Sequence, residues 1–113
     1  MYNSVMTATV IALQGELGSG KTYFVQNFAK IAGVEEQVTS PTFVIMNFYG
    51  IDWQGFKKLV HIDAYRIERE EELINLGWQD LVEDPENIIF IEWPENVPGL
   101  IPEDAKRIHF KHG

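Results

Sequence analysis

An eight-residue run near the start of the chain carries the clearest chemical signal. Residues 15–22 read Gly-Glu-Leu-Gly-Ser-Gly-Lys-Thr, which matches the pattern G-x-x-x-x-G-K-[ST] at every fixed position. Glycines let a backbone turn several N–H groups toward one anion, and a helix that begins at such a loop points its positive end at the same place. The run therefore predicts a site for a nucleoside triphosphate with magnesium, formed by Gly15, Glu16, Leu17, Gly18, Ser19, Gly20, Lys21 and Thr22. We expect Lys21 to contact the β and γ phosphates, and the hydroxyl of Thr22 to face Mg²⁺.

Two acidic residues each follow a mostly apolar run. Asp63 ends the run Leu-Val-His-Ile-Asp at residues 59–63, and Glu92 ends the run Ile-Ile-Phe-Ile-Glu at residues 88–92. Hydrolysis at a phosphate-binding loop needs an acid that holds Mg²⁺, directly or through water, and a group that orients the attacking water. We therefore predict that Asp63 and Glu92 are catalytic together with Lys21, and that Thr22, Glu92 and Asp63 surround the metal. The structural alternative is a carboxylate that only caps the next turn.

The loop needs a strand before it and a helix after it, and the sequence supplies both. Residues 7–14 read as a buried strand, and a helix begins at about Lys21 and ends at Gly33. Its core-facing stripe is Val25, Phe28, Ala29 and Ala32, widened by Phe24 and Ile31. Residues 43–49 and 58–62 read as a hairpin with a turn over 50–55, residues 68–77 as a helix that continues over 78–84, and residues 88–91 and 107–110 as strands. This alternation predicts an α/β three-layer domain, of the kind found in P-loop NTPases, with a mixed, mainly parallel sheet.

Other residues have both a functional and a structural interpretation. Ser40 and Thr42 lie where phosphate-loop proteins often sense the γ-phosphate, but a Ser-Pro turn explains them equally well. Trp93 is a candidate for stacking on the nucleotide or a partner, although tryptophan is mostly a core residue. Arg66 is placed either to stabilise phosphate charge or to form an ion pair. His61 alternates with apolar neighbours, which favours a core histidine.

Composition narrows the class of protein. The 113 residues fit one domain over 1–113, and there are no cysteines, which excludes disulfides and cysteine-based zinc sites. The formal net charge of −8 disfavours unaided binding of nucleic acid, so a role with nucleic acid would be indirect. No apolar run approaches the length of a membrane helix, and a cytoplasmic location is compatible with the absence of cysteine.

Four segments in order resemble one family. They are the loop at 15–22, Ser-Pro-Thr-Phe at 40–43, His-Ile-Asp-Ala-Tyr-Arg at 61–66 and Glu-Trp-Pro-Glu at 92–95. Together they are similar to the TsaE family, small bacterial ATPases of tRNA threonylcarbamoyladenosine synthesis. The resemblance implies a P-loop fold, ATP and Mg²⁺ as cofactors, hydrolysis that is weak alone, and TsaD-like and TsaB-like protein partners. It carries over Lys21 and Thr22 as phosphate and Mg²⁺ contacts, Glu92 and Asp63 as acids needed for turnover, and Trp93 as part of a functional motif.

The chain also departs from the family's pattern. Family members carry a longer segment before the first strand, with a threonine-containing stretch that the resemblance places near the nucleotide base. Two other functions remain open on the residues alone: a non-catalytic nucleotide-binding module and a small P-loop kinase. The low number of arginines speaks against a kinase lid, and no guanine-reading Asn-Lys-x-Asp motif is present.

Overall fold

The computed structural model describes residues 7–16, 19–36 and 45–111. Within these ranges the chain forms the following elements in order: β1 (Thr9–Gln14), α1 (Lys21–Ile31), β2 (Met46–Trp53), β3 (Phe56–Asp63), α2 (Glu70–Ile74), α3 (Trp78–Glu83), β4 (Asn87–Glu92), the 3-10 turns η1 (Pro94–Asn96) and η2 (Pro98–Leu100), and β5 (Lys106–His109). None of the helices in this described part is long and apolar enough to cross a membrane.

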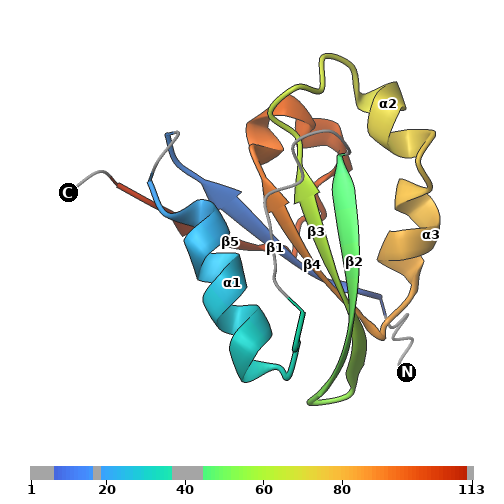
Figure 1. Ribbon diagram of the computed structural model, residues 1–113. Helices are drawn as coiled ribbons and strands as arrows, with labels where there is room; N and C mark the ends of the chain where they lie inside the picture. The colour runs from blue at the N-terminus through green and yellow to red at the C-terminus, as the bar shows by residue number, and fades with distance from the viewer. Residues whose placement is uncertain (1–6, 17–18, 37–44, 112–113) are drawn as a thin grey trace.

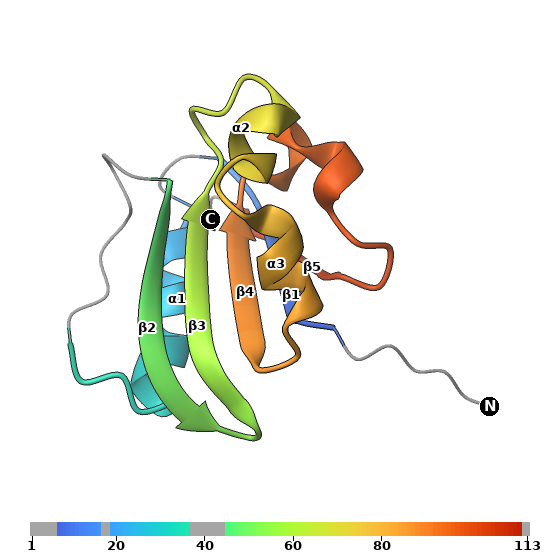
Figure 2. The same cartoon turned by 90° about the vertical axis from the view of Figure 1, so that its right-hand side faces the viewer.

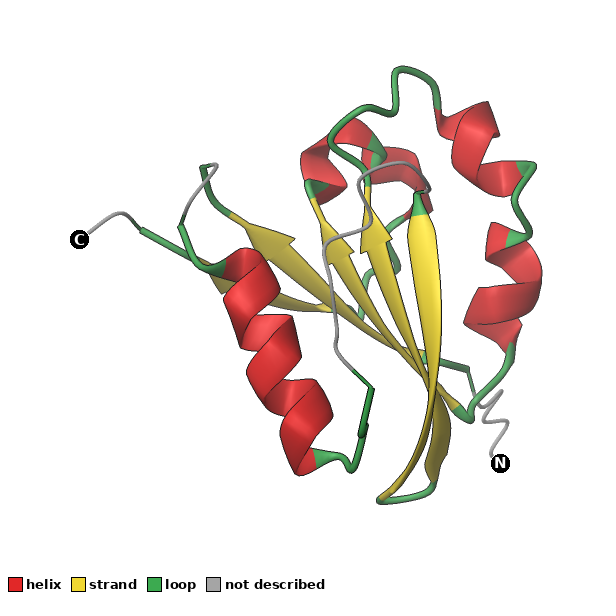
Figure 3. Ribbon diagram, in the orientation of Figure 1, coloured by secondary structure: helices red, strands yellow, loops and turns green. Residues whose placement is uncertain are grey.

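The strands form one mixed sheet between two layers of helix. Its order is β2-β3-β4-β1-β5, with β3, β4, β1 and β5 parallel and β2 antiparallel to β3. Helix α1 covers one face, and α2 and α3 lie on the other, as the two views in Figures 1 and 2 agree. Figure 3 shows the same three layers by type of structure. The predicted fold class, an α/β three-layer domain with a mixed, mainly parallel sheet, is therefore confirmed.

Alternation along the central strands divides the core into two clusters. On β3, Val60 and Ile62 face the cluster that includes Leu73 and Trp78 of the α2 and α3 layer. Leu59 faces the other cluster, which includes Val25 and Ala29 of α1. Because side chains of a strand alternate between faces, His61 and Asp63 share the α1 face with Leu59. All residues of β4 are buried, as expected of a parallel strand covered on both sides.

The hairpin is longer and tighter than the sequence indicated. Strand β2 continues through Gly50 to Trp53, and the turn consists of Gln54 and Gly55, with φ of 50° and 88°. Positive φ at both central residues is the geometry that fits the twist of a two-residue hairpin. Gly50 does not end the strand, so the predicted turn over 50–55 was too wide.

Two predictions about helices also need correction. The helix expected over 68–77 is shorter, and Gly77, with φ of 97°, separates it from α3. Ile31, expected to widen the core stripe of α1, is 72% exposed, because it lies on the opposite side of the helix from the buried Val25, Ala29 and Ala32. Gly33 adopts a left-handed φ of 94° directly after α1, as expected of a residue that closes a helix.

Candidate active site

Three parallel strands bring the predicted acids and the loop to one edge of the sheet. Asp63 is paired with Glu92 across β3 and β4, and Glu92 is paired with Leu13 across β4 and β1. Gly15 follows the end of β1 directly. Because the carboxyl ends of parallel strands meet at one edge, the end of β1 and both acids lie together there, where ligands of such sheets bind.

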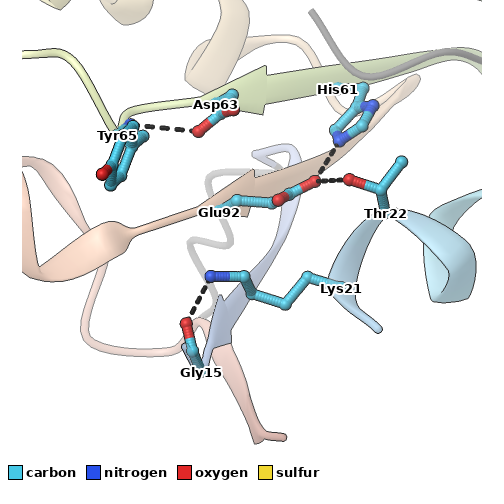
Figure 4. A network of polar contacts seen from close by, with 7 residues as sticks. All are labelled: Gly15, Lys21, Thr22, His61, Asp63, Tyr65 and Glu92. Atoms are coloured by element: carbon cyan, nitrogen blue, oxygen red, sulfur yellow. Dashed lines mark hydrogen bonds and ion pairs between the residues drawn. The ribbon is translucent and has the colours of Figure 1, made fainter. Parts of the chain in front are cut away.

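Glu92 is the centre of a small hydrogen-bond network (Figure 4). Its Oε2 accepts a hydrogen bond from the hydroxyl of Thr22 at 2.9 Å, and the same oxygen lies 2.6 Å from Nε2 of His61. Glu92 is only 4% exposed and His61 is completely buried. The carboxylate is therefore held from two sides, by the first turn of α1 and by the middle of β3.

Lys21, at the start of α1, lies over the same edge. Its ammonium donates a hydrogen bond to the carbonyl of Gly15 and sits 3.8 Å from the centroid of the Trp93 ring. Only 4% of the residue is exposed. Burial lowers the pKa of Lys21, and the charges of Glu92, Glu95 and Asp63 oppose that effect. A lysine in this position is a cation that is poorly hydrated and close to three carboxylates, so a phosphate group would meet a charge with little water to displace.

Asp63 is half-buried and serves the turn that follows it. One of its oxygens accepts the backbone N–H of Tyr65 at 3.0 Å. This is the capping role that was the structural alternative for this residue. Burial raises the pKa of Asp63 and the charge of Glu92 adds to the increase, whereas the N–H of Tyr65 and the nearby His61 and Lys21 lower it. Capping uses one carboxylate oxygen and leaves the group able to take part in chemistry.

The described part of the loop is packed tightly against Phe110, the residue that follows β5. A Cβ added to Gly15 would lie 2.9 Å from the backbone oxygen of Phe110 and 2.6 Å from Oγ of Ser19. Gly20 has a φ of 103°, a left-handed conformation that puts the loop into the first turn of α1. Oγ of Ser19 is buried and has no hydrogen-bond partner in the described structure. A buried hydroxyl of this kind is well suited to a polar ligand in the loop.

The donors at this edge fit Mg²⁺ as it is held beside a nucleotide. No group of three or more His, Cys, Asp or Glu residues in the described ranges could hold a metal ion by itself. Thr22 and Glu92 nevertheless bring two hard oxygen donors within 2.9 Å of each other. Mg²⁺ usually keeps several waters and binds one or two protein oxygens together with substrate phosphates, so two donors are what such a site needs.

Comparison with known proteins shows which family this chain belongs to. The family model described as "Threonylcarbamoyl adenosine biosynthesis protein TsaE" matches residues 1–113. This chain belongs to the TsaE family. It is 38% identical to the protein of Treponema pallidum and 39% identical to that of Borreliella burgdorferi, in each case over 84% of this chain and respectively over 67% and 66% of the relative. Both relatives carry the name "tRNA threonylcarbamoyladenosine biosynthesis protein TsaE". The prediction of the family from four sequence segments is therefore confirmed.

A solved structure has a similar fold. The crystal structure of Bacillus subtilis YdiB matches with a TM-score of 0.73 and 27% identity, over 95% of this chain and 62% of that chain. The chain thus spans about two thirds of the length of these two relatives and 62% of the length of this structural neighbour.

The structure describes most, but not all, of the site residues that were predicted for this TsaE chain. Gly15, Glu16, Ser19, Gly20, Lys21 and Thr22 of the loop, both acids and Trp93 fall in the described ranges, whereas Leu17, Gly18, Ser40 and Thr42 lie outside them. Trp93 adopts a left-handed φ of 61° directly after β4 and packs on Tyr65 with ring centroids 5.1 Å apart. A bulky residue with this φ is a strained position of the kind found at functional sites.

His61 is the residue that sequence reasoning undervalued. It is buried, as a core histidine should be, but its Nε2 contacts Glu92 and its Nδ1 has no hydrogen-bond partner in the described structure. The signal was present in the alternation of β3, since His61 lies two residues before Asp63 and therefore on the same face.

Proposed function

We propose that this chain binds Mg·ATP at the carboxyl edge of β1, β4 and β3 and hydrolyses it in support of tRNA threonylcarbamoyladenosine synthesis. The observation that carries the proposal is the 2.9 Å hydrogen bond between Thr22 and Glu92. It joins the end of the phosphate-binding loop to an acid 70 residues away in the chain. A glycine-rich loop alone predicts binding, whereas the acid beside its threonine supplies the second requirement of hydrolysis.

Each residue has a role that follows from its position. The ammonium of Lys21 exchanges the carbonyl of Gly15 for the β and γ phosphates, and the backbone N–H groups at the start of α1 face the same anion. Thr22 and Glu92 would hold Mg²⁺, directly or through water, and there the ion would supply positive charge to the phosphate oxygens. Trp93 keeps the Lys21 ammonium at the site, because an aromatic face attracts a cation.

Asp63 is the acid that we assign to proton transfer. Its pKa is raised by burial and by the charge of Glu92. Pairs of carboxyl groups that differ in environment divide metal binding and proton transfer between them. In our assignment a water attacks the γ-phosphorus, the bond to the β-phosphate oxygen breaks to release ADP, and the water's proton passes to Asp63.

The chain's charge supports a protein partner. With a net charge of −8, direct contact with tRNA phosphates is unfavourable. We therefore propose that TsaD-like and TsaB-like proteins contact the tRNA while this ATPase docks on them, and that hydrolysis is slow without them. Synthesis on tRNA also makes the cytoplasm the proposed location.

The test measures ATP turnover with and without TsaB and TsaD, for the wild-type chain and for Lys21→Ala and Glu92→Gln. Lys30→Ala is the matched control, because Lys30 is an exposed lysine in the last turn of the same helix. We expect each site variant to reduce turnover at least about 100-fold, as loss of a group that stabilises transition-state charge does, and the control to leave it unchanged. Turnover that survives in Lys21→Ala would exclude the mechanism, and turnover indifferent to both partners would exclude the proposed assembly.

A further inference from the structure

The buried side chains of His61 and Glu92 form a short polar contact. His61 lies in the middle of β3, with Leu59 before it and Asp63 after it on the same face. Within the described ranges, the only hydrogen bond of its side chain joins Nε2 to Oε2 of Glu92 at 2.6 Å. A polar contact this short between two buried side chains restricts where the carboxylate can lie.

The direction of the hydrogen bonds can be assigned from the partners. Nδ1 of His61 is buried without a partner in the described structure. A buried N–H donor without an acceptor loses the full hydration energy of that group, so the proton is better placed on Nε2, where a carboxylate accepts it. His61 therefore donates its Nε2–H to Glu92, while Nδ1 lies in the core.

Thr22 completes the chain of contacts. Its hydroxyl has one proton, which is donated to the same Oε2 at 2.9 Å. With that proton committed, the lone pairs of the hydroxyl oxygen are left for a cation, and the other carboxylate oxygen of Glu92, Oε1, takes neither of these two bonds. Figure 4 shows His61 and Thr22 approaching the carboxylate from different elements.

We propose that His61 is a positioning residue for the magnesium site: its Nε2–H fixes the carboxylate of Glu92, which in turn orients the hydroxyl of Thr22 toward Mg²⁺. The inference rests on the proposed function, since it assumes that Mg·nucleotide binds at this edge. Outer partners that hold a ligand in place typically contribute about 10- to 100-fold to metal affinity. His61 would act through Glu92 without touching nucleotide or metal.

The test compares two substitutions that differ in hydrogen bonding. His61→Gln keeps an N–H donor at about the reach of Nε2, whereas His61→Leu fills the core without a donor. For the wild-type protein and each variant, ATP affinity is measured by titration calorimetry in Mg²⁺ and again in EDTA. The ratio of the affinity in Mg²⁺ to the affinity in EDTA gives the effect of the metal. Binding in EDTA depends on Lys21 and the loop, so it also reports whether the variant is folded.

We expect His61→Leu to reduce the ratio by about tenfold or more and His61→Gln to keep most of it, with affinity in EDTA unchanged in both. An unchanged ratio in His61→Leu, or equal losses in the two variants, would overturn the inference and leave the proposed function intact. If His61→Leu fails to bind ATP in EDTA, His61→Asn replaces it, because the shorter amide cannot reach Glu92, and an equal ratio in Asn and Gln would overturn the inference. A wild-type chain in which Mg²⁺ does not improve ATP binding would instead contradict the proposed function itself.

Discussion

Two variants of Glu92 allow the contribution of its hydrogen bonds to stability to be separated from the contribution of its negative charge. Both bonds reach the same oxygen, Oε2, so a glutamine that places its carbonyl oxygen there can accept both. Glu92→Gln removes the charge and keeps the acceptor. Glu92→Met has similar length and removes both. Because each variant also relieves the repulsion between Glu92 and Asp63, the difference between the two variants isolates the hydrogen bonds.

The size of that difference follows from burial. In Glu92→Met, the N–H of His61 is left without an acceptor in a completely buried position, and the hydroxyl of Thr22 in a partly buried one. A buried donor without a partner costs about 1–3 kcal/mol, and the cost at Thr22 is at the lower end because water can reach its hydroxyl. We therefore expect Glu92→Met to be less stable than Glu92→Gln by about 2–4 kcal/mol. An unfolding entropy of roughly 0.24 kcal/mol/K for 113 residues converts this to a Tm lower by about 8–17 °C.

Urea and thermal unfolding of the metal-free proteins measure this difference directly. Adding His61→Leu to Glu92→Met should recover part of the loss, because removing both partners of a buried bond is far less costly than removing one. Equal stability of the Glu92→Met and Glu92→Gln variants would refute the two hydrogen bonds to Oε2 of Glu92. A failure of His61→Leu to recover any stability would refute the assignment of His61 as the buried donor.

Three further outcomes are expected. Gly15→Ala should lose about 1–3 kcal/mol in urea unfolding, because its Cβ would lie 2.9 Å from Phe110, while Gly50→Ala, whose Cβ meets nothing within 4 Å, should change by less than about 0.5 kcal/mol. Because the pKa of Asp63 is raised in the folded state, the stability that its protonated form contributes is present below about pH 4 and is lost as the pH rises through the folded-state pKa. Asp63→Asn should therefore gain stability over the wild type across that window, and parallel pH curves would contradict this. Adding Mg·ATP should change the tryptophan emission, because bound phosphates alter the contact between the Lys21 ammonium and the Trp93 ring, and Trp93→Phe should abolish the change; a signal retained in that variant would arise from Trp53 or Trp78 and would contradict its assignment to Trp93.

Local sequence patterns were sufficient to predict the strands and the helix that carry the site residues. The loop at 15–22 sets the end of β1 and the start of α1, and apolar runs ending in Asp63 and Glu92 set β3 and β4. The hairpin was misread because Gly50 is a common turn residue. On an edge strand such as β2 it is tolerated, since the outer side of that strand packs against no further strand of the described sheet.

The contacts that matter most for chemistry depend on pairings that no local pattern records. His61 precedes Glu92 by 31 residues, and Thr22 precedes it by 70. They meet only because β4 lies between β3 and β1 in the sheet. Sequence alternation places His61 on the α1 face, but only the order of the strands makes Glu92, and not another polar group, its neighbour.

The position of β4 explains why one carboxylate can serve both neighbours. Every residue of β4 is buried, and its neighbours β3 and β1 run parallel to it. Glu92 is therefore carried by a strand that cannot shift without disturbing both flanking strands and both core clusters. A site whose central acid is fixed in this way can keep Thr22 and His61 within hydrogen-bond distance without a ligand, and such preorganisation is what allows charge stabilisation to act on the transition state.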